Sequence, residues 1–527
     1  MPPHRPHAGR APVRCGLGLF FLAVCATGTV RSQCPDGTPP PCGAAPRLLA
    51  AARAPETNSV AVLPFENVRR DTADAYLGDG LASSIATSLA QVPRLSVRSP
   101  GFVRRVSQSG VHDERALGRQ LDVRYLVEGE YQRGGQRIRV AVRLVTLPSG
   151  TERWGDAYLR PSADLLGVQE EIAREVATRI AGALLPAETR ALAARPTHNP
   201  AAYDLLLRGN FHLAQRTPAG VRRAIDAYQA AARLDSTYAD PLARVAYAYG
   251  LVLSYDWDFG LSRDSALALG VADAERAVRL DSLSSDAWLA RGLLLTYLKP
   301  ATFDGVLPSL ERAVRLDPRN VEAWHQFGTQ QQYLNDPAGS DTSLRRAAAL
   351  EPDRAVTLTN IGTGLELAGR FDEARRWCDS ALALSPGWAY GLAARMRIAI
   401  AQHDTATARA TATALGAITA PDAVPAVMAA VARYDAWRGD TASARERAER
   451  AVAAYGGNPR ELWLGMPAAM ALAEAGEADR ALDLLERLQP HGVVMHLLLR
   501  TSGFDPLRAN PRFARLFAET APPGAPR

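Results

Sequence analysis

The stretch that decides the fold, residues 313–386, reads AVRLDPRNVEAWHQFGTQQQYLNDPAGSDTSLRRAAALEPDRAVTLTNIGTGLELAGRFDEARRWCDSALALSP. Four sets of positions in and beside it recur with a step of 34 residues: Pro318, Pro352 and Pro386; Ala313, Ala347 and Ala381; Trp324, Leu358 and Leu392; Gly328 and Gly362. A fixed step of this size indicates stacked helical units, because each unit is too small to bury its apolar side without a neighbour. We therefore expect an all-α solenoid in this half of the chain.

The period and its small residues resemble the tetratricopeptide repeat (TPR), a pair of antiparallel helices. Two helices approach closely only where glycine or alanine replaces a larger side chain, and a proline then ends the second helix. Similar helix endings, AARLDS at 231–236 and AVRLDS at 277–282, extend the pattern upstream. The resemblance implies seven or eight units in a superhelical array over residues 197–520. The ending FDPLRANPRFARLF, residues 504–517, is typical of the helix that caps such an array.

In a TPR array the first helix of each pair lines a concave surface, whose usual partner is an extended peptide or a partner helix. The register predicts that polar and aromatic side chains line this surface in the central repeats. They are His325, Thr329, Gln332, Tyr333, Thr359, Asn360, Thr363, Glu366, Tyr390 and Arg397. The alternative for each one is a solvated side chain with no binding role.

A different pattern occupies residues 57–186, which we expect to form a small mixed α/β domain. SVAVLPF at 59–65 and LSVRSP at 95–100 are predicted strands, because they are apolar and rich in β-branched residues. Helices are predicted at 73–91, 114–121 and 165–185, where leucine, isoleucine and valine recur at helical spacing. The complete chain is thus of the α+β class, a small sheet domain followed by a helical array.

The clearest β signal is the pair of segments VRYLVEGEY and QRIRVAVRLVT, which a Gly-Gly turn joins. Alternation puts Ile138, Val140, Val142 and Leu144 on one face and three arginines on the other. On the preceding strand two glutamates, 128 and 130, share one side. Cross-strand pairing of opposite charges explains this set, and an anion or substrate site is the alternative.

Several motifs of this domain are familiar together: SVAVLPFEN, YLGDGLASSIATSLAQ, LGRQLDVRYLVEGEYQRGGQRIRVAVRLVTLPSGTERWGDAY and VQEEIAREV. The stretch resembles the TolB amino-terminal-like domain that precedes TPR arrays in many bacterial signalling and envelope proteins, and is similar to the FlgO fold. The resemblance implies a binding or sensory module without established catalytic residues.

Residues needed for several kinds of catalysis are missing from the sequence. Lys299 is the only lysine, and it lies outside any GxxxxGK[ST] or VAIK motif, so P-loop, kinase and Schiff-base chemistry are not supported. We interpret it as a solvated loop residue, and Cys378 as a small buried apolar group. The sequence has no HExxH, CxxC, GxSxG or SxxK motif. We therefore expect no metal, no cofactor and no enzyme activity; an enzyme with an unrecognised site is the alternative.

The amino-terminal segment has the layout of a secretory signal peptide. Three arginines precede the apolar run GLGLFFLAVCATGTV at 16–30, which is shorter than a membrane span. We predict a signal peptide over 1–32 and a Pro/Ala-rich linker over 33–56. An uncleaved inner-membrane anchor, or lipidation at Cys25, is the alternative. Cys34 and Cys42 form either a disulfide or two free thiols.

Most of the excess positive charge lies in this leader. Six of the arginines and one acidic residue fall in the first 55 positions, whereas the whole chain has a net charge of +6. The folded part is thus nearly neutral, and no nucleic-acid partner is expected.

These observations predict a non-enzymatic protein-interaction scaffold, exported to the periplasm or cell envelope, with a peptide or protein as partner. The alternative is the sensory or regulatory part of a signal-transduction system whose output domain lies on another chain.

Overall fold

The computed structural model of the chain describes residues 56–111, 113–255, 257–299, 302–419, 424–454, 462–488 and 492–521. The predicted signal peptide, the linker through residue 55 and the Cys34 and Cys42 pair lie outside these ranges. Within the ranges, no helix combines the length and the apolar character that crossing a bilayer requires.

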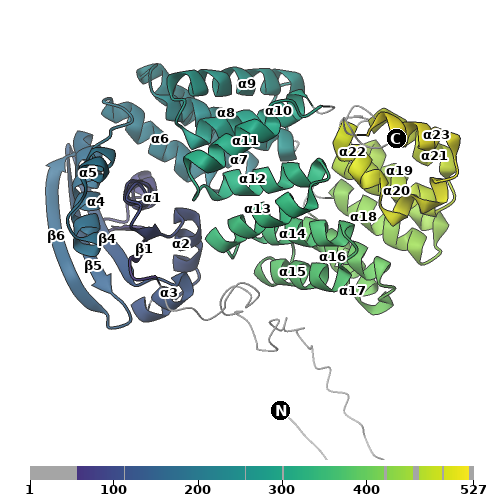
Figure 1. Ribbon diagram of the computed structural model, residues 1–527, viewed down its shortest axis with the longest axis horizontal. Helices are drawn as coiled ribbons and strands as arrows, with labels where there is room; N and C mark the ends of the chain where they lie inside the picture. The colour runs from purple at the N-terminus through teal and green to yellow at the C-terminus, as the bar shows by residue number, and fades with distance from the viewer. Residues whose placement is uncertain are drawn as a thin grey trace, which may run out of the picture. The chain divides into compact units, whose positions relative to one another are not determined.

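The first described part is a mixed β-sheet (Figure 1). Its strands are β1 (Ser59–Val62), β2 (Glu66–Asn67), β3 (Ser96–Val97), β4 (Tyr125–Gly134), β5 (Arg137–Thr146) and β6 (Thr151–Pro161). Their order is β3-β1-β4-β5-β6, and β2 pairs with β4 as well. Strand β1 runs parallel to β3 and β4, whereas β4, β5 and β6 pair in antiparallel fashion.

Helices cover this sheet on both faces. They are α1 (Tyr76–Leu89), α2 (Pro100–Ser107), α3 (Glu114–Leu121), α4 (Leu165–Ala181) and α5 (Pro186–Leu192). Helices α1 and α4 share one apolar core with the sheet, and α2 and α3 share a second core with the opposite face of β1 and β4. The predicted face of β5 is confirmed, since Ile138, Val140, Val142 and Leu144 are all at most 4% exposed.

The open side of the sheet carries the predicted pairs of opposite charge. Arg139 Nη1 lies 3.1 Å from Glu130 Oε1, and Arg143 Nη2 lies 2.5 Å from Glu128 Oε2. Arg143 also contacts Glu114 at 2.7 Å. Each glutamate therefore has an arginine partner, which confirms the cross-strand interpretation.

Two predicted boundaries are corrected. The strand expected through Pro100 ends at Val97, and Pro100 instead begins α2, because proline suits the first position of a helix, where no N–H bond is lost. The helix predicted to residue 185 ends at Ala181, where Gly182 has a φ of +77° that only glycine adopts easily.

In the described ranges, eight antiparallel helix pairs follow the sheet domain. They are α6 (Pro200–Leu213) with α7 (Pro218–Leu234), α8 (Ala239–Tyr255) with α9 (Arg263–Leu280), α10 (Ser285–Leu298) with α11 (Val306–Leu316), α12 (Val321–Tyr333) with α13 (Pro337–Leu350), α14 (Ala355–Leu367) with α15 (Phe371–Leu384), α16 (Ala389–Ala401) with α17 (Thr405–Gly416), α18 (Val424–Trp437) with α19 (Thr441–Ala454), and α20 (Leu462–Glu474) with α21 (Ala478–Leu488). Lys299 is exposed just after α10, as predicted.

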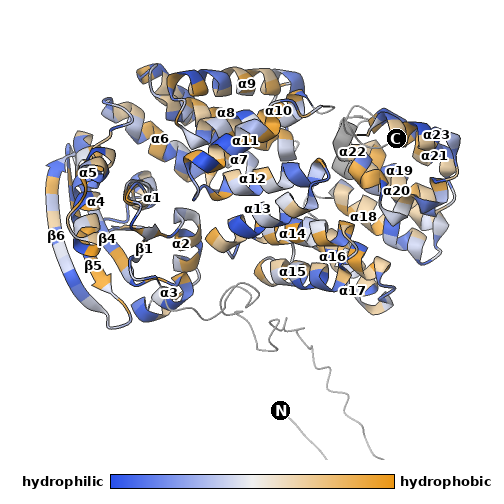
Figure 2. Ribbon diagram, in the orientation of Figure 1, coloured by the Kyte–Doolittle hydropathy of each residue, from blue (hydrophilic) through white to orange (hydrophobic). Residues whose placement is uncertain are grey.

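The predicted period is present in the helices themselves. Helices α12, α14 and α16 begin at Val321, Ala355 and Ala389, a step of 34 residues. The recurring prolines lie two residues beyond the ends of α11, α13 and α15, where they cannot interrupt a helix. Figure 2 shows hydrophilic and hydrophobic residues mixed on most of these helices, as expected for pairs that bury one side.

The carboxyl end of the array is covered by α22 (Gly492–Leu499), a short 3-10 helix (Ser502–Leu507) and α23 (Pro511–Glu519). Phe504, Leu507, Phe513 and Leu516 are each at most 2% exposed, and α23 packs against α21 and α22. This segment therefore covers apolar side chains at the end of the array.

The sheet domain contacts the array in two places. Helix α1 packs against α6, the first helix of the array. Far along the chain, Arg105 of α2 binds two carboxylates between α13 and α14: its Nη2 is 2.9 Å from Glu351 Oε2, and its Nε is 2.7 Å from Asp353 Oδ2. Ser99 also donates a hydrogen bond to Glu351. The first domain therefore touches both the first and the central repeats.

Candidate functional site

The ten residues predicted to line the concave surface all lie on three first helices, α12, α14 and α16. These helices are neighbours, since α12 contacts α14 and α14 contacts α16. The stacking of the pairs thus brings together side chains that are up to 72 residues apart, from His325 to Arg397.

Hydrogen bonds join these side chains from one repeat to the next. Asn360 Nδ2 donates to Thr329 Oγ1 at 3.1 Å, and the Tyr390 hydroxyl donates to Asn360 Oδ1 at 3.2 Å. Arg397 Nη2 lies 2.9 Å from Glu366 Oε2 and 3.4 Å from Thr363 Oγ1. We call this series of hydrogen-bonded side chains on α12, α14 and α16 the polar ladder. Some of its hydrogen-bonding groups are already paired with each other within the array.

Burial separates the ten residues into groups. Tyr333, Thr363, Glu366, Tyr390 and Arg397 keep part of their surface exposed, whereas Thr329, Gln332 and Asn360 are 7–8% exposed. His325 is 5% exposed and lies 3.1 Å from Thr357 Oγ1. Thr359 has no exposed surface, so we leave it out of the proposed binding surface.

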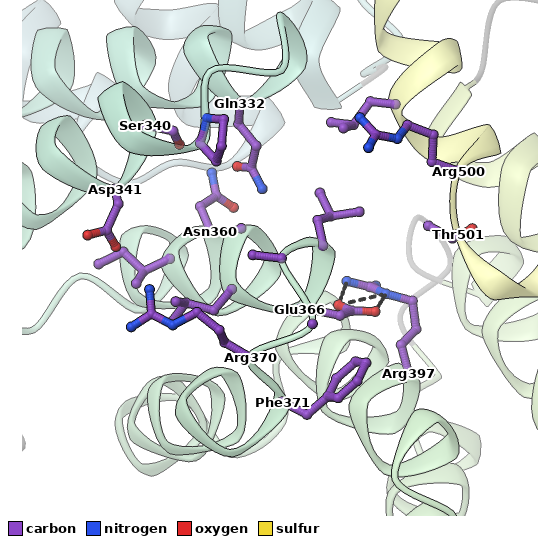
Figure 3. Close-up of a pocket in the computed structure, with 18 of the residues that line it drawn as sticks. Gln332, Ser340, Asp341, Asn360, Glu366, Arg370, Phe371, Arg397, Arg500 and Thr501 are labelled. Atoms are coloured by element: carbon purple, nitrogen blue, oxygen red, sulfur yellow. Dashed lines mark hydrogen bonds and ion pairs between the residues drawn. The ribbon is translucent and has the colours of Figure 1, made fainter.

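A cavity of about 490 Å³ opens beside the ladder. Of the predicted residues, Gln332, Asn360, Glu366 and Arg397 line it (Figure 3). The rest of the wall comes from the start of α13, the turn between α14 and α15, helix α18 and the carboxyl-terminal segment. The predicted residues His325, Thr329, Tyr333, Thr359, Thr363 and Tyr390 are not part of this wall.

Most of the lining residues were not predicted, among them Arg433 of α18, and Arg500 and Thr501 after α22. Arg500 Nη1 donates to Asn335 Oδ1 at 2.8 Å, across 165 residues of sequence, and α22 contacts α12. No local pattern indicates such a contact, because it depends on how far the complete array curves. The carboxyl-terminal segment thus forms one side of the cavity, as Figure 3 shows for Arg500 and Thr501.

A cluster of charges lies at the amino-terminal ends of the same helices. Glu322 of α12 is 2.5 Å from Arg354 Nη2 and 3.3 Å from Arg216 Nη2. Burial disfavours the charged carboxylate and so raises its pKa, but the attraction of the two arginines is larger. The pKa of Glu322 is therefore held well below its usual range. In the same way Arg105 and Arg354 outweigh burial and lower the pKa of Glu351. Burial, with Arg354 next, lowers the pKa of His325 to about 3.

These shifts predict a loss of stability in acid. His325 binds its proton in the unfolded chain near pH 6.5 but in the folded chain only near 3, so stability falls as pH drops between those values. The lowered pKa values of Glu322 and Glu351 add a further loss below about pH 4.5. Urea unfolding at a series of pH values measures the loss of stability from His325 and the further loss from the two glutamates.

The variant His325→Asn separates the two effects. It is expected to reduce the slope of stability against pH between about 6.5 and 3, and to leave the further loss that Glu322 and Glu351 cause below about 4.5. His212 and His496 also have pKa values lowered by burial, so some slope stays. An unchanged slope in the variant would contradict the assignment to His325.

In the part of the chain that the structure describes, no group of three His, Cys, Asp or Glu side chains is placed to hold a metal ion. Cys378 is fully buried, and burial raises the pKa of its thiol to about 12, which agrees with the predicted packing role.

Comparison with known proteins finds no family model that matches the chain. A Rhizobium meliloti (strain 1021) protein with the provisional name adenylate cyclase 3 is 33% identical over 156 residues, which are 29% of this chain and 26% of that relative. The chain thus spans about a quarter of the length of this curated relative.

Solved structures that match part of the chain include two pilus proteins and a TPR protein. PilF of Pseudomonas aeruginosa is 17% identical, with a TM-score of 0.33, over 41% of this chain and 90% of its own. The type IV pilus biogenesis factor PilW is 19% identical, with a TM-score of 0.33, over 42% and 96%. A TPR protein of Parabacteroides merdae ATCC 43184 is 12% identical, with a TM-score of 0.35, over 48% and 93%.

The helix pairs and their 34-residue step define an array of stacked helical repeats, as the resemblance to TPR sequences predicted, preceded in the chain by a small mixed sheet domain.

Proposed function

We propose that this chain is a non-enzymatic protein-interaction scaffold whose TPR array binds a segment of a partner protein in its concave surface. The observation that carries the proposal is the cavity of about 490 Å³ beside the polar ladder of α12, α14 and α16. A cavity of this size suits a short segment or a few side chains. The partly exposed groups there, Glu366 and Arg397 among them, can hydrogen bond to a peptide.

Further parts of the proposal rest on the sequence. An exported protein of the periplasm or cell envelope fits the signal-peptide pattern of residues 1–32. The TolB amino-terminal-like resemblance of residues 57–186 fits a module that binds a second partner. The two contacts between this domain and the array would then keep the two partners at a fixed separation.

Site-specific photo-crosslinking tests the scaffold function. Arg370 lines the cavity, yet its side chain is 52% exposed, so a benzoylphenylalanine there is expected to fold and to reach a bound partner. Arg315 on α11 is the matched control, because it is 60% exposed and does not line the cavity. The proposal expects one partner that crosslinks from position 370 and not from position 315 in the native host.

Mass spectrometry of the crosslinked band then separates the scaffold from its alternative. Secretion or envelope-assembly proteins support the scaffold. Equal crosslinking from positions 370 and 315, or none from either, would contradict a partner in this cavity.

A signalling role is the second candidate, and the match to the relative with a cyclase name favours it. In that case the chain would be the sensory part of a system with its output domain on another protein. Retrieval of a kinase or a transcription regulator from position 370 would support it. Activity of this chain on a substrate, kept after the whole array is replaced, would instead support an enzyme.

A further inference from the structure

The cavity has an excess of positive charge among its lining residues. Four arginines line it, at positions 370, 397, 433 and 500, whereas Asp341 and Glu366 are the acids among the lining residues. Glu366 is paired with Arg397, and Asp341 lies 2.7 Å from Arg345, which is outside the lining. Both acids are thus already paired with arginines. A bound acidic group would therefore need an arginine whose N–H donors are not fully used within the chain.

Arg433 is one of these arginines. Its side chain is 6% exposed, and its Nε has no hydrogen-bond partner among the described residues. The nearest carboxylate in the described chain belongs to Glu474, at 3.6 Å, which is too long for a good hydrogen bond. Buried guanidinium groups normally satisfy their donors, so Arg433 Nε, which has only this long ion pair with Glu474, can still donate a hydrogen bond to a closer acceptor.

Arg500 is the second. Its hydrogen bond goes to the neutral amide oxygen of Asn335, and no described carboxylate forms an ion pair with its guanidinium. Figure 3 shows Arg500 on the side of the cavity opposite Glu366 and Arg397. Arg433 and Arg500 therefore come from different elements, α18 and the segment after α22, and line one cavity.

We propose that this cavity binds the carboxylate of an aspartate or glutamate side chain in the partner segment, through Arg433 and Arg500. The proposal rests on the scaffold function above and names the chemistry of the partner. A guanidinium binds a carboxylate with two parallel hydrogen bonds, and a carboxylate would supply the acceptor that Arg433 Nε lacks. A purely apolar segment would leave Arg433 Nε without a hydrogen-bond acceptor and would cover the Arg500 guanidinium with no carboxylate beside it, which is costly.

Fluorescence anisotropy with three labelled hexapeptides tests this on the full-length chain. The probes are hexaglutamate with an amidated carboxyl end, hexaglutamine with an amidated end, and hexaglutamine with a free end. At low ionic strength the amidated hexaglutamate is expected to bind at least ten times more tightly than either glutamine peptide. Preference for the free-ended glutamine peptide would overturn the assignment to side chains in favour of a chain terminus.

Substitutions locate the binding. Arg500→Gln, at an exposed surface position, is expected to weaken hexaglutamate binding at least tenfold, and Arg500→Lys by less. Arg433→Gln is expected to act in the same direction, with its folding checked by circular dichroism. Arg315→Gln, outside the cavity, is the control for nonspecific attraction and is expected to leave the affinity unchanged. Equal affinities for Arg500→Gln and the unaltered chain would overturn the proposal.

Competition separates this inference from the scaffold function. Hexaglutamate is expected to suppress the crosslink from position 370, and hexaglutamine is not. A crosslink that persists under saturating hexaglutamate would overturn the inference of an acidic partner segment, but it would not contradict the proposed scaffold function. The absence of any position-specific crosslink would contradict the scaffold function, whether or not hexaglutamate binds to the chain.

Discussion

Replacing Gly362 by leucine is expected to lower the free energy of unfolding of the array by about 3 kcal/mol. Gly362 lies on α14 where that helix crosses α15, and a Cβ atom there would sit 2.6 Å from Cys378 Sγ and 3.1 Å from the Ala374 carbonyl oxygen. The sulfur belongs to a fully buried side chain and the oxygen to the backbone, so neither moves aside cheaply. The two helices must separate to admit the leucine.

Urea unfolding followed by circular dichroism measures this change, and hydrogen exchange in α14 and α15 localises it. Gly416→Leu is the matched control. Gly416 ends α17 and is exposed, and a Cβ there meets nothing within 4 Å. Leucine is the better helix former, so this variant is expected to be neutral or slightly more stable. Equal destabilisation at both positions would show that close packing at Gly362 is not the cause.

The same residue shows why the array could be predicted from sequence. Gly328 and Gly362 recur because each faces the second helix of its own pair, and a Cβ at Gly328 would meet Leu344 Cγ at 2.8 Å. The constraint is local, within one unit, and it recurs in the two consecutive units of α12 and α14, so it leaves a visible period. The β5 hairpin was equally visible, because alternation follows from the strand geometry.

Features that depend on contacts between residues far apart in the chain could not be predicted from the sequence. The Pro100 and Gly101 pair reads as the end of a strand, yet it begins α2, and a Cβ on Gly101 would lie 2.8 Å from Glu351 Oε1. The reason for this glycine is thus 250 residues away in the sequence. In the candidate site, register alone indicated Gln332 and Arg397, whereas Arg433 and Arg500 reach the cavity only through the curvature of the whole array.

Replacing Glu322 by alanine is expected to cost about 3 kcal/mol of stability, because it removes the shared partner of two arginines. Arg354 has only 15% of its side chain exposed, and without Glu322 its charge loses its closest acid, which lies 2.5 Å away. Arg216 is 42% exposed and can turn toward water, so its share of the loss is smaller. Gln326 also loses the carboxylate that accepts its amide hydrogen bond at 2.9 Å.

The consequence of this change reaches beyond one repeat. Arg216 follows α6, Glu322 is on α12 and Arg354 precedes α14, so the cluster joins the first repeat to the central ones. Glu351, beside Arg354, binds Arg105 of the sheet domain. Losing Glu322 is therefore expected to loosen the curvature that brings Arg500 to Asn335, and hexaglutamate binding should weaken along with stability.

Glu311→Ala separates this effect from a general loss of charge. Glu311 also pairs with an arginine, Arg315, but both side chains are about half exposed, at 49% and 60%, and pairs of this kind contribute less than about 0.5 kcal/mol. Urea unfolding should therefore distinguish the two variants clearly. If Glu322→Ala were as stable as Glu311→Ala, the buried cluster would not be what holds the first and central repeats together, and the cavity would have to owe its shape to apolar packing alone.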